Sequence, residues 1–206
     1  MNKSLIKPLI AAIFAMLAVS SGNVFATASI GNPAPQFKLA DLNGKTVKLA
    51  DFKGRHVVLE WHNPNCPFVM KHYDSGNMPR LQAKYDVKDT VWLSINSTHP
   101  GHQDYVSGDK LARYLAEKKA SPDAYLIDAE GSVGIEYSAK TTPHMYVINP
   151  AGTLVYAGAI DDKRSTRLED VKTARNFLVA ALEESKAGKP VTTATTTPYG
   201  CSVKYR

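Results

Sequence analysis

Cysteine is scarce in this chain: of its 206 residues, only Cys66 and Cys201 carry a thiol. Two cysteines allow at most one disulfide, which excludes a small scaffold held together by several disulfides. Basic residues are not concentrated either, because no run of five or more lysines and arginines occurs. This argues against a nucleic-acid-binding protein, and we expect the formal net charge of +6 to favour solubility and anionic partners.

The chain also lacks an apolar run long enough to span a membrane. Its longest one, LIAAIFAMLAV, covers Leu9–Val19 and follows Lys3 and Lys7. A short apolar run behind positive charges and ahead of small residues is typical of a secretory signal peptide. We predict a signal peptide over residues 1–28 and a secreted or periplasmic protein with no membrane attachment after cleavage. A membrane anchor is the alternative.

The remaining composition is ordinary for a globular protein, with 44% hydrophobic and 21% charged residues, so one buried core is expected. Two short alternating runs around Asn43-Gly44 predict a β-hairpin within residues 31–55. The elements expected after it are a strand at 56–61, a helix from 67, a strand at 90–96, a helix at 110–119, a strand at 124–128, two strands within 141–161 and a helix at 167–188. This order predicts an α/β fold for residues 29–188, with a mixed central sheet flanked by helices, and a tail at 189–206.

One cysteine lies in a segment with an unusual pattern, NPNCPFVMKHY. Pro67 follows Cys66 directly, and proline is tolerated in the first turn of a helix, so we expect Cys66 at a helix start. Unpaired N–H groups and the helix dipole favour an anion there, which favours the thiolate form of Cys66. We therefore interpret Cys66 as a reactive thiol. The alternative is a small buried core residue.

Two further segments carry a family resemblance: APQFKLADLNGKTVKLADFKGRHVVLEW and DAEGSVGIEYSAKTTPHMYVINPAGTLVYAGAID. With Cys66 between them, residues 35–160 resemble the thioredoxin-like redoxins of the AhpC/TSA type, a group of peroxiredoxins and exported thiol-disulfide oxidoreductases. The resemblance implies a thioredoxin-like fold with its nucleophilic cysteine at Cys66. It also implies a cis peptide bond between Thr142 and Pro143, where such proteins present backbone groups to an extended substrate.

The same resemblance implies a proton-shuttling acid at Glu60, within the apolar run 56–61. Desolvation raises the pKa of a carboxyl group in a buried strand, which suits the group to general acid–base catalysis. The alternative is a glutamate at a solvated sheet edge.

The motif around the first cysteine departs from both patterns in that family. Val69 stands where thioredoxins carry a second cysteine, so the local motif is Cys-Pro-Phe-Val. Asn63 stands where peroxiredoxins carry a threonine or serine, which leaves Asn63 as a candidate to hydrogen-bond a peroxide. Cys201 is the remaining thiol, and we predict that it resolves the intermediate formed at Cys66. The alternatives are a permanent disulfide that fastens the tail, and cysteines that are unpaired or that pair between molecules.

We predict an exported oxidoreductase that performs thiol-disulfide exchange or peroxide reduction, needs no cofactor or metal and uses an unidentified thiol electron donor. Two other classes stay open. Thiol, thioether and imidazole ligands suit Cu(I), so a copper-chaperone-like protein is one of them; its candidate ligands are Cys66, Met70, His62, His72 and His144. The other class is a thioredoxin-fold binding module without catalysis, which the absence of a second nearby cysteine fits.

Overall fold

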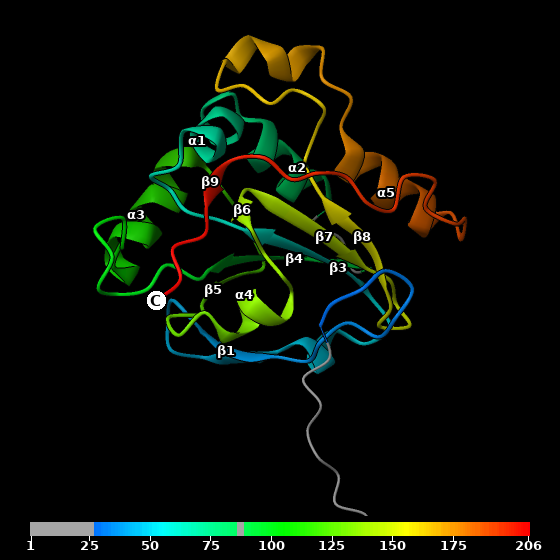
Figure 1. The fold of residues 1–206 in the computed structure, drawn as a ribbon, viewed down its shortest axis with the longest axis horizontal. Coiled ribbons are helices and arrows are strands. Elements are labelled where there is room, and N and C mark those ends of the chain that lie inside the picture. The colour runs from blue at the N-terminus through cyan, green and yellow to red at the C-terminus, as the bar shows by residue number, and fades with distance from the viewer. Residues whose placement is uncertain (1–26, 86–88) are drawn as a thin grey trace, which may run out of the picture.

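The computed structural model describes residues 27–85 and 89–206, so almost all of the predicted signal peptide lies outside the described residues (Figure 1). Within them the α-helices are α1 (Pro67–Asp74), α2 (Asn77–Tyr85), α3 (Gly108–Lys118), α4 (Ser132–Glu136) and α5 (Phe177–Lys186), and the 3-10 helices are η1 (Leu49–Phe52) and η2 (Leu168–Lys172). The strands are β1 (Lys38–Asp41), β2 (Thr46–Lys48), β3 (His56–Trp61), β4 (Thr90–Asn96), β5 (Ala124–Ile127), β6 (Thr141–Thr142), β7 (His144–Ile148), β8 (Leu154–Gly158) and β9 (Cys201–Ser202).

Seven of these strands form one mixed sheet in the order β2-β1-β5-β4-β3-β7-β8. β3, β4 and β5 run parallel, whereas β1 and β7 pair with them antiparallel. Every residue of β3 and β4 is buried, as expected for central strands that are covered on both faces. The sheet therefore places the ends of β3 and β7 side by side at its centre, which is where the candidate site forms.

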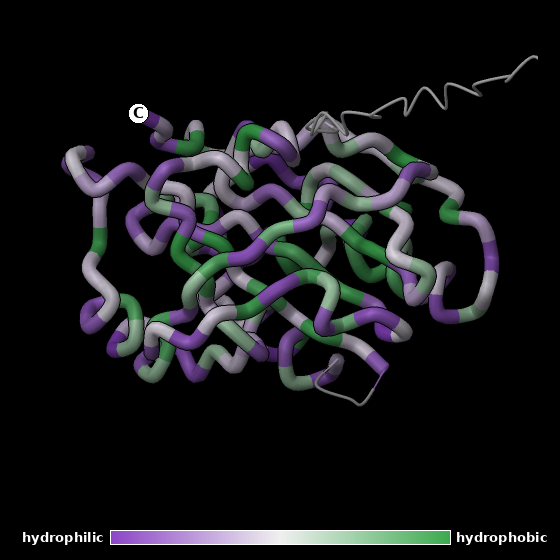
Figure 2. Tube along the Cα trace, turned by 90° about the horizontal axis from the view of Figure 1, so that it is seen from below, coloured by the Kyte–Doolittle hydropathy of each residue, from purple (hydrophilic) through white to green (hydrophobic). Residues whose placement is uncertain are grey.

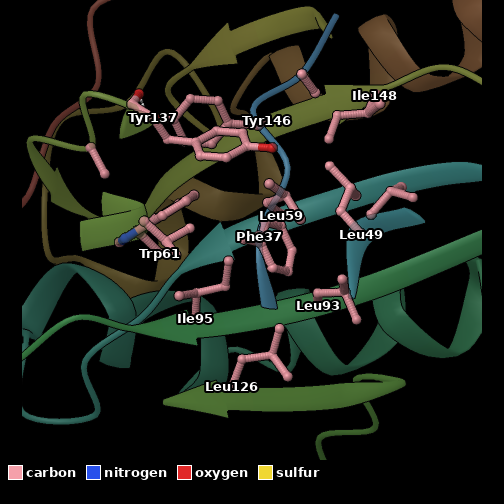
Figure 3. Packing of buried hydrophobic residues seen from close by; sticks show 14 of the residues in the cluster. Phe37, Leu49, Leu59, Trp61, Leu93, Ile95, Leu126, Tyr137, Tyr146 and Ile148 are labelled. Atoms are coloured by element: carbon pink, nitrogen blue, oxygen red, sulfur yellow. Dashed lines mark hydrogen bonds between the residues drawn. The ribbon is translucent and has the colours of Figure 1, made fainter. Parts of the chain in front are cut away.

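Each face of the sheet has its own core, because successive side chains of a strand point to opposite faces. Leu59 and Trp61 of β3 belong to the cluster drawn in Figure 3, which the N-terminal hairpin and α4 cover. Val58 belongs to the opposite cluster, which packs against α1, α2 and α5. Glu60 shares this second face with Val58. Figure 2 shows hydrophilic residues mainly on the outer turns and hydrophobic residues mainly on the inner strands.

Most predicted elements are present. The hairpin turns at Asn43-Gly44, where Gly44 has a φ of +77°, a conformation that glycine adopts without strain. The proline-led helix is split into α1 and α2 at the Ser-Gly-Asn interruption. None of the helices in the described part of the chain is long and apolar enough to cross a membrane.

The predicted continuous helix over Arg167–Gly188 is wrong. The chain forms η2, then leaves the helical path, and α5 begins only at Phe177. Residues 175–176 pair instead with Asp161 and Asp162: the Asp161 and Asn176 backbones form an antiparallel bridge, and Arg175 N donates to Asp162 Oδ1 at 2.9 Å. Asn176 then caps α5 by accepting from Val179 N at 2.9 Å. These tertiary bonds outweigh the helical periodicity of the segment.

Candidate active site around Cys66 and Cys201

Cys66 occupies the N-cap position of α1, directly after the loop that leaves β3. Asn63 shapes this loop: its Oδ1 accepts from Asn65 N at 2.8 Å, and its carbonyl accepts from Cys66 N at 3.1 Å. Pro67 then occupies the first helical position, where a missing N–H leaves no partner unsatisfied. Cys66 is therefore held rigidly at a helix start, and only 2% of its surface is exposed.

The segment directly before β7 places two more predicted site residues, Thr142 and Pro143, beside Cys66. Trp61 of β3 pairs with His144 of β7, so the residues before β7 lie beside the loop after β3. The Thr142–Pro143 peptide bond is cis, as the family resemblance implies. The Thr142 carbonyl oxygen lies 3.0 Å from Cys66 Sγ and accepts a hydrogen bond from it.

The tail supplies the second thiol from the opposite direction. β9 pairs antiparallel with β6, with Cys201 opposite Thr142 (Figure 1, where the red segment meets β6). Both cysteines are thiols in this structure, and their Sγ atoms lie 2.7 Å apart. Thus the two cysteines, distant in sequence, meet at the start of α1.

A glycine makes this approach possible. Gly200 has a φ of +141°, and a Cβ atom at this position would lie 2.0 Å from the Thr142 carbonyl oxygen. No side chain fits at that distance, so the close pairing of β9 with β6 requires glycine directly before Cys201.

The surroundings of Cys201 disfavour the loss of its thiol proton. Burial raises the pKa of Cys201 to about 12, and the hydrogen bond and charge of neighbouring Cys66 act in the same direction. Cys201 therefore keeps its proton next to Cys66, which makes it a hydrogen-bond donor when Cys66 is a thiolate.

Glu60 is completely buried, so the alternative of a solvated edge glutamate is wrong. Burial raises the pKa of its carboxyl group to about 7, although four hydrogen bonds act in the opposite direction. The donors are Tyr73 Oη at 2.8 Å, Trp92 Nε1 at 2.9 Å, Ser94 Oγ at 3.1 Å and Gln82 Nε2 at 3.5 Å. Tyr73 lies on α1, so the carboxyl group is connected to the helix that carries Cys66 rather than to its sulfur.

Each of the three candidate copper-binding histidines has a ring nitrogen beside a tyrosine hydroxyl, although Nε2 of His62 is buried without a hydrogen-bond partner. His62 Nδ1 lies 2.7 Å from Tyr125 Oη, His72 Nε2 lies 3.3 Å from Tyr199 Oη, and His144 Nδ1 lies 3.0 Å from Tyr146 Oη. Burial lowers the pKa of each imidazole to about 3. Across residues 27–85 and 89–206, no group of three or more histidines, cysteines and acids is placed to hold a metal ion.

One buried cluster near the site is not apparent from the sequence. Tyr199 from the tail donates a hydrogen bond to Asp161 Oδ1, and Asp161 Oδ2 lies 3.6 Å from Lys71 Nζ of α1. The hydroxyl of Tyr199 therefore lies in a charged cluster rather than on an apolar surface. Asp161 carries no local signal for this role, because its partners come from α1 and the tail.

A model of the AhpC/TSA family matches residues 30–157, well over half of the chain. The chain belongs to the AhpC/TSA family. Among curated relatives of this AhpC/TSA protein, the thiol-disulfide oxidoreductase ResA of Bacillus thuringiensis subsp. konkukian is 29% identical over 126 residues, which cover 55% of this chain and 72% of the relative.

Solved structures agree on the fold of this AhpC/TSA protein. An uncharacterized conserved protein from Geobacillus kaustophilus superposes with a TM-score of 0.73 at 27% identity, covering 89% of this chain and 94% of that one. The thioredoxin domain of a thiol-disulfide oxidoreductase from Bacteroides vulgatus gives a TM-score of 0.51 at 20% identity, over 71% of this chain and 98% of that domain. The predicted thioredoxin-like fold and family are thereby confirmed.

Proposed function

We propose that this protein is a thiol-disulfide oxidoreductase in which Cys66 attacks and Cys201 resolves. The observation that carries the proposal is the 2.7 Å separation of the two sulfur atoms beside the cis Thr142–Pro143 bond. The relatives named thiol-disulfide oxidoreductases support the same class of chemistry. Export, as a secreted or periplasmic protein, is proposed from the sequence of residues 1–28 alone.

The proposed reaction starts from the dithiol. The Cys66 thiolate attacks one sulfur of a substrate disulfide, the substrate S–S bond breaks, and one substrate thiolate leaves. Cys201 then loses its proton and attacks Cys66 Sγ, which releases the second substrate thiolate and forms a Cys66–Cys201 disulfide. Two electrons pass from the protein to the substrate, and an external thiol donor returns them.

The start of α1 favours Cys66 as the attacking group. The unpaired N–H groups and the dipole of the helix favour negative charge at its N-cap. Cys201 is held as the protonated partner, because burial and Cys66 together raise its pKa. Once Cys66 is in a mixed disulfide, its charge no longer opposes ionisation of Cys201, and the second attack becomes easier.

A disulfide substrate is favoured over a peroxide by the surroundings of Asn63. Its Nδ2 donates to Thr98 Oγ1 at 2.9 Å after β4 and its Oδ1 accepts from Asn65 N, so both ends of the amide hold the loop in place. A substrate strand would bind where β9 now pairs with Thr142. Glu60 is proposed as a proton relay that acts through Tyr73 of α1 rather than directly on Cys66.

The proposal is tested with the reduced protein, a peptide disulfide and mass spectrometry. The wild type should yield the Cys66–Cys201 disulfide and two free peptide thiols. Cys201→Ser should accumulate a peptide linked to Cys66, and Cys66→Ser should not react. Full reaction of Cys66→Ser would rule the mechanism out, and a pair that resists reduction in the folded protein would favour a structural disulfide.

A further inference from the structure

The charged cluster beneath the tail is fully enclosed. Lys71 and Asp161 have side-chain exposures of 0% and 2%, and Tyr199 is also buried at 2%. Lys71 Nζ donates to the Lys163 carbonyl at 2.7 Å and lies 3.4 Å from Tyr199 Oη. His72 Nε2 lies 3.3 Å from the same hydroxyl. The tyrosine hydroxyl is therefore surrounded by polar partners from α1 and from the segment after β8.

The ring of the same tyrosine is also enclosed. It packs edge to face against Phe68 of α1, with ring centroids 5.8 Å apart, and Lys71 Nζ lies 5.5 Å from its centre. Tyr199 thus joins the tail to the first two turns of α1, the helix that Cys66 caps. The hydroxyl and the ring both fix the place of the tail relative to this helix.

Only one residue separates this tyrosine from the second thiol. Gly200 follows Tyr199, lies against the Thr142 carbonyl and leads directly into Cys201. β9 contains just two residues, and so short a pairing provides few hydrogen bonds of its own. After β9 the tail is held by backbone hydrogen bonds of Val203 and Lys204, and before β9 Tyr199 is the nearest buried side chain that can hold the strand in register.

Stability alone does not account for this cluster, because a buried ion pair contributes little net stabilisation. A buried ion pair loses its hydration, and apolar replacements of the same size are often no less stable. Directed hydrogen bonds to a charged group, however, fix the position of the group that donates them. The placement of the pair under the tail tyrosine therefore fits a role in positioning.

We propose that Tyr199, held by Asp161 and Lys71, is a positioning residue that places Cys201 for its attack on Cys66 and keeps β9 over Cys66 between turnovers. This inference rests on the proposed function, since it assigns the anchor of the resolving thiol. It has two consequences of opposite sign. Loss of the anchor slows the second attack, because Cys201 spends less time at Cys66, and speeds the first attack, because the cover over Cys66 opens more often.

The experiment uses the reduced protein and 5,5′-dithiobis(2-nitrobenzoate), a coloured aromatic disulfide. Attack by Cys66 breaks its S–S bond and releases one nitrothiobenzoate anion. Attack by Cys201 on the Cys66 adduct releases a second anion and forms the Cys66–Cys201 disulfide. Absorbance therefore reports the two steps as separate phases in one stopped-flow trace.

Tyr199→Phe keeps the ring and removes only the hydroxyl. A hydrogen bond to a charged group contributes enough for its loss to slow the second release by about tenfold, while the first release becomes faster. The matched control is Tyr137→Phe, which removes a buried hydroxyl that donates to the Pro35 carbonyl at 2.7 Å, in the core on the opposite face of the sheet from Tyr199. Both phases of the control should match the wild type.

Each outcome bears on the proposal. Slower second release with faster first release in Tyr199→Phe supports the anchor, and Asp161→Asn should repeat both directions even if Tyr199→Phe folds poorly. Unchanged phases in both variants, or both phases slowed together, overturn the anchor and leave the Cys66–Cys201 mechanism intact. A wild type that releases a single anion overturns the resolving role of Cys201 and the anchor with it.

Discussion

Replacement of Glu60 by glutamine should remove a pH-dependent loss of stability that the buried carboxyl group causes. Glu60 is completely enclosed, and burial raises the pKa of its carboxyl group from 4.5 to about 7. Below pH 4.5 the group is protonated in both the folded and the unfolded chain. Between pH 4.5 and about 7 the unfolded chain releases the proton while the folded chain retains it, so the free energy of unfolding falls as the pH rises.

The size of the effect follows from the shift. At about 1.4 kcal/mol per pH unit, a rise from 4.5 to about 7 corresponds to a loss of about 3 kcal/mol, complete above pH 7. Three buried histidines, His62, His72 and His144, act in the opposite direction. Burial lowers the pKa of each imidazole to about 3, so their contribution is present above pH 6.5 and is lost as the pH falls.

The assay therefore compares the free energies of unfolding of wild type and variant, because the histidine contributions are the same in both and cancel in the difference. Urea unfolding of wild type and Glu60→Gln is followed at half-unit steps from pH 4 to pH 8, and the free energies of unfolding are subtracted. The wild type should lose about 3 kcal/mol relative to the variant between pH 4.5 and 7.5. The same exchange at exposed Glu130 should leave the difference flat. A flat difference for Glu60→Gln, or one complete by pH 5, would refute the reasoning.

The remaining predictions concern the tail and its anchor. Gly200→Ala cannot keep β9 in place, because its Cβ would lie 2.0 Å from a carbonyl oxygen; alkylation of Cys66 by iodoacetamide should accelerate by about tenfold or more. The control Gly188→Ala has a similarly positive φ of +68° but open space around it, so equal acceleration there would contradict this explanation. Lys71→Met leaves Asp161 buried without its cation and should lower the free energy of unfolding by about 3–5 kcal/mol in urea titrations. Adding Asp161→Asn should restore part of that loss, and no restoration would show that the ion pair is not the cause.

The sequence predicts the centre of the fold well because its signals there are local. The run His56–Trp61 is apolar except for His56 and Glu60, and such a run is typical of a strand covered on both faces. Pro67 marks the helix start, and glycine at the hairpin turn marks the reversal of the chain. Cys66 at the start of α1 follows from these signals with no knowledge of the rest of the molecule.

Other features depend on partners far away in the chain, and the sequence does not reveal them. The segment before α5 is periodic enough to predict a helix, yet its backbone pairs with Asp161 and Asp162 instead. β9 is too short to show any alternation, and its place is determined by Gly200 and Tyr199. Asp161 acquires its partners, Lys71 and Tyr199, only when α1 and the tail pack around it.

The separation of the two thiols also sets an order in time. The ribosome adds Cys66 135 residues before Cys201, which at about 5–20 residues per second is a delay of roughly 7–27 s. During that interval the growing chain carries one thiol with no partner, and any disulfide it forms must be with another molecule. The two sulfur atoms meet only after β7 has paired with β3 and β9 with β6, so formation of the proposed Cys66–Cys201 disulfide in a pulse-labelled culture would report how fast the domain folds.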